Sequence, residues 1–244
     1  MQIRMMSWNI HKAIGNDRKF RPERVIEVIR HHRPDVLLMQ EVDRGVPRSR
    51  RLDLDQIVAE GTGLPYFAWG GNHVLKEGSY GNATLSRFPI RRKRNLDLTI
   101  AWKKKRGALF TRLQLPGHFK DLMVFNWHLG LSAQERRRQV ERFLRSGTLK
   151  GLGKTSRIIL GGDTNDWRNL LFRGAGLQTH GFHAWTESGR HKHIATYPSV
   201  APVGPLDKFF WRGGFPEVRV HASKMALARQ ASDHLPILGE FTLG

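Results

Sequence analysis

The chain contains the stretch Arg157-Ile158-Ile159-Leu160-Gly161-Gly162-Asp163-Thr164-Asn165. The apolar run at 158–160 is typical of a buried β-strand, and two glycines lead from it to Asp163 and Asn165. The predicted strand therefore ends on polar side chains. In folds that layer helices against sheets, polar groups at strand ends can converge at one sheet edge, where such folds commonly build sites.

Five further polar clusters are spread along the chain, and five of the six begin with or follow an apolar run. Their side chains include carboxylates, carboxamides and histidines, without cysteine. This set of ligand types suits a hard cation such as Mg²⁺ or Mn²⁺ better than zinc or copper. The six clusters are residues 7–11, 40–43, 126–129, 161–165, 206–208 and 232–236.

The length of 244 residues allows one or two domains. A split into two domains would divide the six clusters, so we predict a single domain over residues 1–244. The absence of cysteine excludes disulfides, thiolate catalysis and cysteine-ligated metals. It is compatible with a reducing compartment, and we predict a cytoplasmic protein.

The formal net charge is +20, from 41 Lys and Arg against 21 Asp and Glu. Such a charge favours a phosphate-bearing polyanion as partner, either nucleic acid or an anionic lipid surface. The alternative is a basic protein whose arginines are simply solvated. The first residues show no apolar segment of a secretion signal, and no run of 18 apolar residues predicts a membrane span. No protein partner is predicted.

The order of predicted elements indicates an α/β (α+β) fold. Strands outnumber helices, and tight connections such as Pro116-Gly117, between 107–115 and 121–128, favour antiparallel pairing. We expect two mixed, largely antiparallel sheets packed face to face with helices outside. Loops or turns are predicted at 70–72, 76–81 and 91–94, and residues 166–205 are expected to be irregular.

Three positions favour metal or phosphate chemistry. Glu41 follows the apolar run 36–39, where a carboxylate must meet water, a cation or a metal because an unpaired buried charge is costly. The alternative for Glu41 is a salt bridge to an arginine. The alternative for Asn9 is that its side chain only forms hydrogen bonds to the backbone of a loop. Asp163 and Asn165 share one face if the backbone is extended, so Asp163 can deprotonate a water while Asn165 holds a phosphoryl oxygen. Their alternative is an ordinary turn.

The last cluster places Asp233 beside His234. In an extended segment the two side chains point to opposite sides, so Asp233 can face a metal while His234 faces a phosphate. His234 then needs another carboxylate to fix its tautomer, and Asp207 is the candidate. His128 can supply a second donor. His11 and Lys12 are further candidates for contact with the substrate. The alternative for each histidine is a structural role.

These clusters, in this order, resemble the endonuclease/exonuclease/phosphatase superfamily, from Trp8-Asn9 to Asp233-His234. The segment 81–89 also resembles a family segment and would place Asn82 near the site. Asn9-Ile10-His11-Lys12 makes the chain most similar to small bacterial stand-alone members. Thr164 and Lys208 depart from the residues that many relatives carry there, which leaves the substrate open.

The resemblance implies a DNase I-like four-layer α/β sandwich with the site at one sheet edge. It implies that Glu41 is the main metal ligand, with Asn9 and Asp233 nearby, and that Asp163 orients the attacking water. It also implies that Asn165 contacts the phosphate. His234, supported by Asp207, and His128 would stabilise the transition state.

We therefore expect a Mg²⁺- or Mn²⁺-dependent phosphoesterase that uses direct, in-line attack by water. Nucleic acid is favoured as substrate over a phospholipid or phosphoinositide headgroup. The other class of function is a non-catalytic phosphate-binding module. The phosphate loop of nucleotide-binding proteins and the nucleophile elbow of serine hydrolases are both absent from the sequence.

Overall fold

The computed structural model describes residues 1–187 and 191–244. Its strands form two six-stranded sheets, with orders β11-β12-β1-β2-β4-β3 and β5-β6-β7-β8-β10-β9. The first sheet contains β1 (Gln2–Asn9), β2 (Val36–Arg44), β3 (Tyr66–Val74), β4 (Ser79–Ser86), β11 (Glu217–Ala222) and β12 (Ile237–Thr242). The second contains β5 (Ile90–Asp97), β6 (Gly107–Leu113), β7 (Leu122–His128), β8 (Arg157–Asp163), β9 (His183–Ala184) and β10 (Asp207–Arg212).

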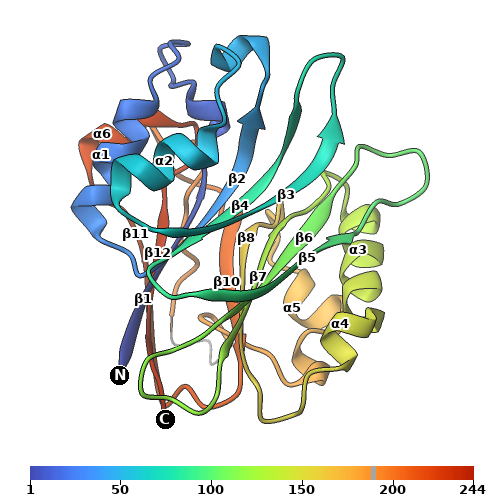
Figure 1. Cartoon of the computed structure of the whole chain (residues 1–244). Coiled ribbons are helices and arrows are strands. Elements are labelled where there is room, and N and C mark those ends of the chain that lie inside the picture. Colours follow the sequence, from blue (N-terminus) through green and yellow to red (C-terminus); the bar gives the residue numbers. More distant parts are fainter. Residues whose placement is uncertain (188–190) are drawn as a thin grey trace.

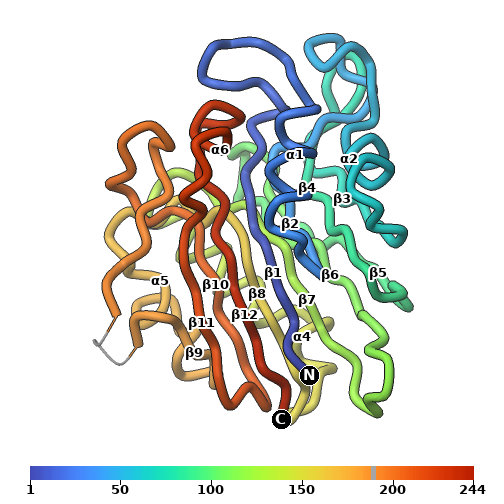
Figure 2. Tube along the Cα trace, turned by 90° about the vertical axis from the view of Figure 1, so that its left-hand side faces the viewer, coloured from blue at the N-terminus to red at the C-terminus, as the bar shows by residue number. Residues whose placement is uncertain are grey.

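Helices cover the outer faces of both sheets (Figure 1 and Figure 2). On the first sheet lie α1 (Pro22–His32), α2 (Leu54–Thr62) and α6 (Ala226–Ala231); on the second lie α3 (Ala133–Arg145), α4 (Gly147–Lys150) and α5 (Leu171–Gly174). Three short 3₁₀ turns are η1 (His11–Ala13), η2 (Pro47–Ser49) and η3 (Gln178–His180). Among the described helices, none has the length and hydropathy needed to cross a membrane.

Apolar side chains fill three spaces between these four layers. The middle space, between the sheets, holds Leu38 of the first sheet and Ile159 and Phe209 of the second. The second sheet packs Phe125 and Trp127 against α3, and a matching cluster lies under α1, α2 and α6. The expected fold class, two mixed sheets flanked by helices, is confirmed.

The strand directions bring the polar strand ends to one edge. β1 and β2 are parallel, with Asn9 opposite Gln40, and β7 and β8 are parallel, with His128 opposite Asp163. β10 runs antiparallel to β8 and places Asp207, its first residue, beside Asp163.

Gly161 allows the two sheets to approach closely just below this edge. A Cβ atom at this position would lie 2.8 Å from a methyl carbon of Leu38 and 2.7 Å from the ring of Phe209. Both distances are below van der Waals contact, so any larger residue would require the side chains of Leu38 and Phe209 to shift beneath the site.

Several predicted loops are strands. The cationic stretch 91–94 lies in β5, 70–72 lies in β3, and 79–81 lies in β4. β5 and β3 are edge strands of their sheets. An edge strand exposes much of its surface, so charged or small polar residues are tolerated there and the apolar signal of a buried strand is lost. The stretch 166–205 contains α5, η3 and β9, and the short helix α6 was not predicted.

Candidate active site

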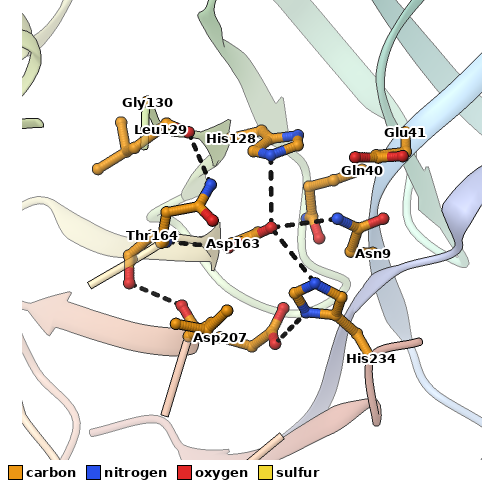
Figure 3. Close-up of polar contacts among 12 residues, drawn as sticks. Asn9, Gln40, Glu41, His128, Leu129, Gly130, Asp163, Thr164, Asp207 and His234 are labelled. Carbon is orange, nitrogen blue, oxygen red and sulfur yellow. Dashed lines mark hydrogen bonds and ion pairs between the residues drawn. The ribbon is translucent and has the colours of Figure 1, made fainter. Parts of the chain in front are cut away.

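Asp163 is the centre of the polar cluster at the sheet edge (Figure 3). It ends β8 and is 1 % exposed. Its Oδ2 accepts a hydrogen bond from Nδ2 of Asn9 at 3.1 Å. The same oxygen lies 3.3 Å from Nε2 of His128 and 3.8 Å from Nε2 of His234. Four of the residues predicted from distant parts of the sequence thus meet at one carboxylate.

Two hydrogen bonds hold the chain segments of this cluster together. The Trp8 indole donates to the His234 carbonyl at 2.9 Å, and the Ser232 hydroxyl donates to the Asn9 carbonyl at 2.7 Å. Both bonds are buried and join β1 to the segment before β12. The positions of Asn9 and His234 are therefore fixed relative to each other.

Asp207 binds His234, as the sequence predicted. Its Oδ2 lies 2.9 Å from Nδ1 of His234 and also accepts a hydrogen bond from the Thr196 hydroxyl at 2.6 Å. The carboxylate fixes the ring so that Nε2 faces Asp163. The Tyr197 ring packs against the imidazole, with centroids 4.9 Å apart.

The protonation states in the cluster differ because its environment is buried and charged. Burial raises the pKa of Asp163 to about 6, against the opposing effect of His234. Burial would lower the pKa of His234, but the carboxylates of Asp207 and Asp163 outweigh it and raise that pKa to about 10. Burial, helped by the Arg106 guanidinium, holds the pKa of His128 well below its ordinary value. At neutral pH the cluster therefore combines an anionic Asp163, a cationic His234 and a neutral His128.

Glu41 lies beside this cluster and is paired with Lys12. It sits in a β-bulge of β2, where the register with β4 shifts between Met39 and Val42. Glu41 and Lys12 both adopt left-handed backbone conformations, with φ of 56° and 60°, which are uncommon for residues other than glycine. The Lys12 ammonium donates to Oε2 of Glu41. Burial disfavours the charged form, but the Lys12 ammonium outweighs it, and the pKa of Glu41 is lowered.

The remaining predicted residues lie at the same edge with different contacts. Nδ1 of His11 lies 4.0 Å from Oδ1 of Asp233 and bonds to the Ile14 carbonyl at 2.9 Å. Asp233 is half-exposed, whereas the adjacent His234 is buried. The expected division of these two neighbours to opposite sides agrees with this arrangement.

Asn165 differs from its expected geometry, and Asn82 forms hydrogen bonds from one sheet to the other. The backbone at Asn165 is left-handed, with φ 51°, so Asp163 and Asn165 are not on one extended face. Its Nδ2 donates to the Leu129 carbonyl at 2.9 Å, and its backbone N–H donates to Asp163 at 2.9 Å. Asn82 is buried, and its Nδ2 donates to the carbonyls of Gly107 and Asn126, which joins the two sheets. Substrate contact by either side chain remains a proposal.

Sequence reasoning missed several residues that border the site. Lys104 and Arg106 belong to the basic turn 103–106 of the sequence, but their effect on His128, whose pKa both cations lower, was not foreseen. Thr196 and Tyr197 lie in the stretch expected to be irregular. No residue pattern marks these contacts, because they depend on where long loops return to the sheet edge.

Two groups of side chains offer ligands for a divalent cation. Asp163, Asp207 and His234 present ligand atoms within 4.8 Å of one another. In that group, however, the imidazole and carboxylates are already bonded to each other and are almost fully buried. The second group is Glu41 with Asn9 and Asp233, whose oxygen donors fit a hard cation. The Lys12 ammonium already supplies a positive charge against Glu41, which indicates that this position favours a cation.

Comparison with known proteins agrees with this geometry. The profile of the Endonuclease/Exonuclease/phosphatase family matches residues 6–234. The chain belongs to this family. Members of the family are generally phosphoric ester hydrolases that depend on a divalent metal.

Proteins similar to this member of the family include both a sequence and solved structures. The uncharacterized protein YbhP of Escherichia coli strain K12 is 28 % identical over 250 residues, which cover 99 % of this chain and 96 % of YbhP. A family structure from Beutenbergia cavernae superposes with a TM-score of 0.79 at 23 % identity, covering 100 % of this chain and 72 % of that one. Humanized TDP2 of D. rerio superposes with a TM-score of 0.75 at 20 % identity, covering 99 % of each chain. These structures support the fold.

Proposed function

We propose that this chain is a divalent-metal-dependent phosphoesterase that hydrolyses its substrate by direct attack of water on phosphorus. The observation that carries the proposal is the position of Asp163. Its carboxylate lies within 3.8 Å of an imidazole that a second carboxylate holds, and it accepts a hydrogen bond from Asn9. A merely structural buried aspartate has no need of two flanking histidines and a supporting carboxylate.

The protonation states suit this chemistry. A base works best when its pKa lies near the operating pH, and the pKa of Asp163 is raised to about 6. Asp163 takes a proton from the attacking water while the water oxygen bonds to phosphorus and the bond to the leaving oxygen breaks. Cationic His234 then stabilises the charge that grows on the phosphoryl oxygens. Neutral His128 adds a hydrogen bond, and Asp207 keeps the His234 ring in place.

Glu41, Asn9 and Asp233 are the proposed holders of the divalent ion, with Mg²⁺ or Mn²⁺ as the candidates. When bound, such an ion neutralises phosphoryl charge and eases departure of the leaving oxygen. The Lys12 ammonium pairs with Oε2 of Glu41. An ion held by Glu41 would compete with this pairing, and a displaced ammonium would then be available to a substrate phosphate, together with His11.

Nucleic acid is the substrate that we propose, in keeping with the net charge of +20, and a cytoplasmic location fits it. The second candidate is an anionic lipid headgroup. Exposed apolar side chains on loops at the site edge favour it, including Leu131, which is 76 % exposed, and Val203, which is 73 % exposed. Aliphatic side chains of this kind insert into lipid but do not stack on bases.

The function is tested by removing and restoring the metal. Protein stripped with EDTA is assayed with Mg²⁺ or Mn²⁺ on DNA, RNA, phospholipid and inositol phosphates, together with bis(p-nitrophenyl) phosphate as a small diester and p-nitrophenyl phosphate as a monoester. We expect hydrolysis only after a divalent ion is restored. Turnover that persists in EDTA, or no turnover of any substrate with either ion, would argue for a non-catalytic module.

A further inference from the structure

A cationic groove runs between β5 and α3, away from the cluster around Asp163. It encloses a volume of about 870 Å³. β5 lies along the edge of the second sheet, and α3 covers that sheet's outer face (Figure 1). Four arginines line the groove, one from β5 and three from α3: Arg94, Arg138, Arg142 and Arg145.

The arginines of α3 form a line. Positions 138, 142 and 145 are spaced by four and three residues, so they share one helix face, and they extend over about 10 Å at 1.5 Å per residue. Two acidic residues also line the groove, and each already bonds to another group of the chain. Glu141 pairs with Arg145 and Arg137, and Asp97 accepts the backbone N–H of Thr99 at 2.8 Å.

Two guanidinium groups of the groove are free to bind an anion. Arg94 and Arg138 are exposed, and neither has a carboxylate partner within the described ranges 1–187 and 191–244. Exposed cations without acidic partners attract polyanions, because each phosphate contact releases condensed counterions from the polyanion.

The loop 98–106 connects the groove with the proposed active site. At the groove end, Arg142 donates to the Thr99 carbonyl. At the site end, Lys104 lies 3.5 Å from the Tyr80 hydroxyl, and Arg106 is close enough to lower the pKa of His128. Between them Trp102 is 92 % exposed. Lys103 and Lys105 flank this ring in sequence, so cations and an exposed aromatic side chain follow one another from site to groove.

We propose that this groove and loop bind a single-stranded nucleic acid whose scissile phosphate lies at Asp163. This inference rests on the proposed function. Arginines contact successive phosphates, while the Trp102 ring stacks on an unpaired base. A lipid surface fits the groove less well, because its cations line a concave channel along a helix rather than a flat face. The substrate class is therefore a polynucleotide that extends several residues to one side of the cleaved bond.

The test measures binding of fluorescein-labelled (dT)₂₀ by anisotropy in EDTA, so that no cleavage occurs. The double variant R94Q/R138Q is compared with R33Q/K224Q, which removes two exposed cations on the α1 and α6 side of the molecule. Loss of two contacts to a single strand lowers the salt dependence by about 1.4 and the affinity in 0.1 M salt by about 25-fold. R33Q/K224Q is expected to stay within about twofold of the wild type, since these cations lie outside the groove and keep only weak long-range attraction.

Trp102→Ala separates bases from backbone. It is expected to weaken (dT)₂₀ binding about fivefold or more but to leave binding of an abasic oligonucleotide unchanged. Equal affinity of R94Q/R138Q and R33Q/K224Q for (dT)₂₀ would overturn the proposal. So would a loss of binding by R94Q/R138Q that is confined to anionic phosphatidylglycerol vesicles.

Turnover of a small diester and binding of the oligonucleotide test the two proposals separately. Bis(p-nitrophenyl) phosphate is too small to reach the groove, so its turnover reports on the proposed function alone. Turnover of this diester together with unchanged oligonucleotide binding by R94Q/R138Q would support the proposed function and overturn the role of the groove. Oligonucleotide binding that depends on the groove, without turnover of any substrate, would support the groove as a binding site and overturn the proposed function.

Discussion

Replacing Asp163 by asparagine is expected to lower kcat by about 10²-fold or more, with little change in KM. Asparagine fills the same space but cannot take a proton from water. It also removes the negative charge that His234 faces at 3.8 Å. The measurement is steady-state hydrolysis of bis(p-nitrophenyl) phosphate with Mg²⁺ or Mn²⁺, together with a thermal melt to establish that the variant is folded.

Asp35→Asn is the matched control for this substitution. Asp35 is also a buried carboxylate, but it precedes β2 and so lies at the opposite edge of the sheet. It accepts the Arg4 backbone N–H at 2.8 Å and pairs with Arg87 at 3.0 Å. Its loss is expected to reduce stability but not turnover. Equal turnover of Asp163→Asn and wild-type protein would remove Asp163 from the chemistry.

Replacing Glu41 by glutamine is expected to abolish tight metal binding. Loss of an outer-sphere partner of a metal site costs about 10- to 100-fold in affinity, and loss of the main ligand should cost at least as much. Calorimetric titration with Mn²⁺ measures this directly, with Glu60→Gln on the exposed face of α2 as control. Unchanged Mn²⁺ affinity in Glu41→Gln would place the metal elsewhere.

Lys12→Met tests whether the ammonium occupies the place of the ion. Without metal, this variant leaves Glu41 as a partly buried, unpaired carboxylate, so its Tm is expected to fall in EDTA. A divalent ion then restores the missing charge, and the rise in Tm on adding Mn²⁺ should exceed that of the wild type. A smaller rise would mean that Lys12 supports metal binding rather than competing with it.

Much of the fold follows from burial alone. The apolar runs at 36–39 and 158–160 mark central strands because both faces of these strands are covered. Residues 70–72 of β3 and 91–94 of β5 escape this reasoning. They lie in edge strands and carry no apolar side chain, because 70–72 are two glycines and an asparagine and 91–94 are exposed cations. Composition alone cannot distinguish such a strand from a loop.

The site was predictable as a set of residues but not as a set of contacts. Asn9, His128, Asp163, Asp207 and His234 each follow or precede an apolar run, and the sheet brings them together. The pairing of Lys12 with Glu41 depends on two left-handed residues and a bulge. Sequence reasoning named an arginine as the alternative partner of Glu41, whereas the partner is a lysine. The turn at Asn165 was the alternative to the extended backbone that we expected, and its left-handed φ agrees with that alternative.

The proposed hydrolysis depends on a divalent ion at Glu41. The direct measurement is an anomalous difference map from crystals soaked in Mn²⁺. The predicted result is one peak within bonding distance of the Glu41 carboxylate, with the Lys12 ammonium moved away from it. A peak enclosed by Asp163, Asp207 and His234 instead, or no peak at this sheet edge, would contradict the account.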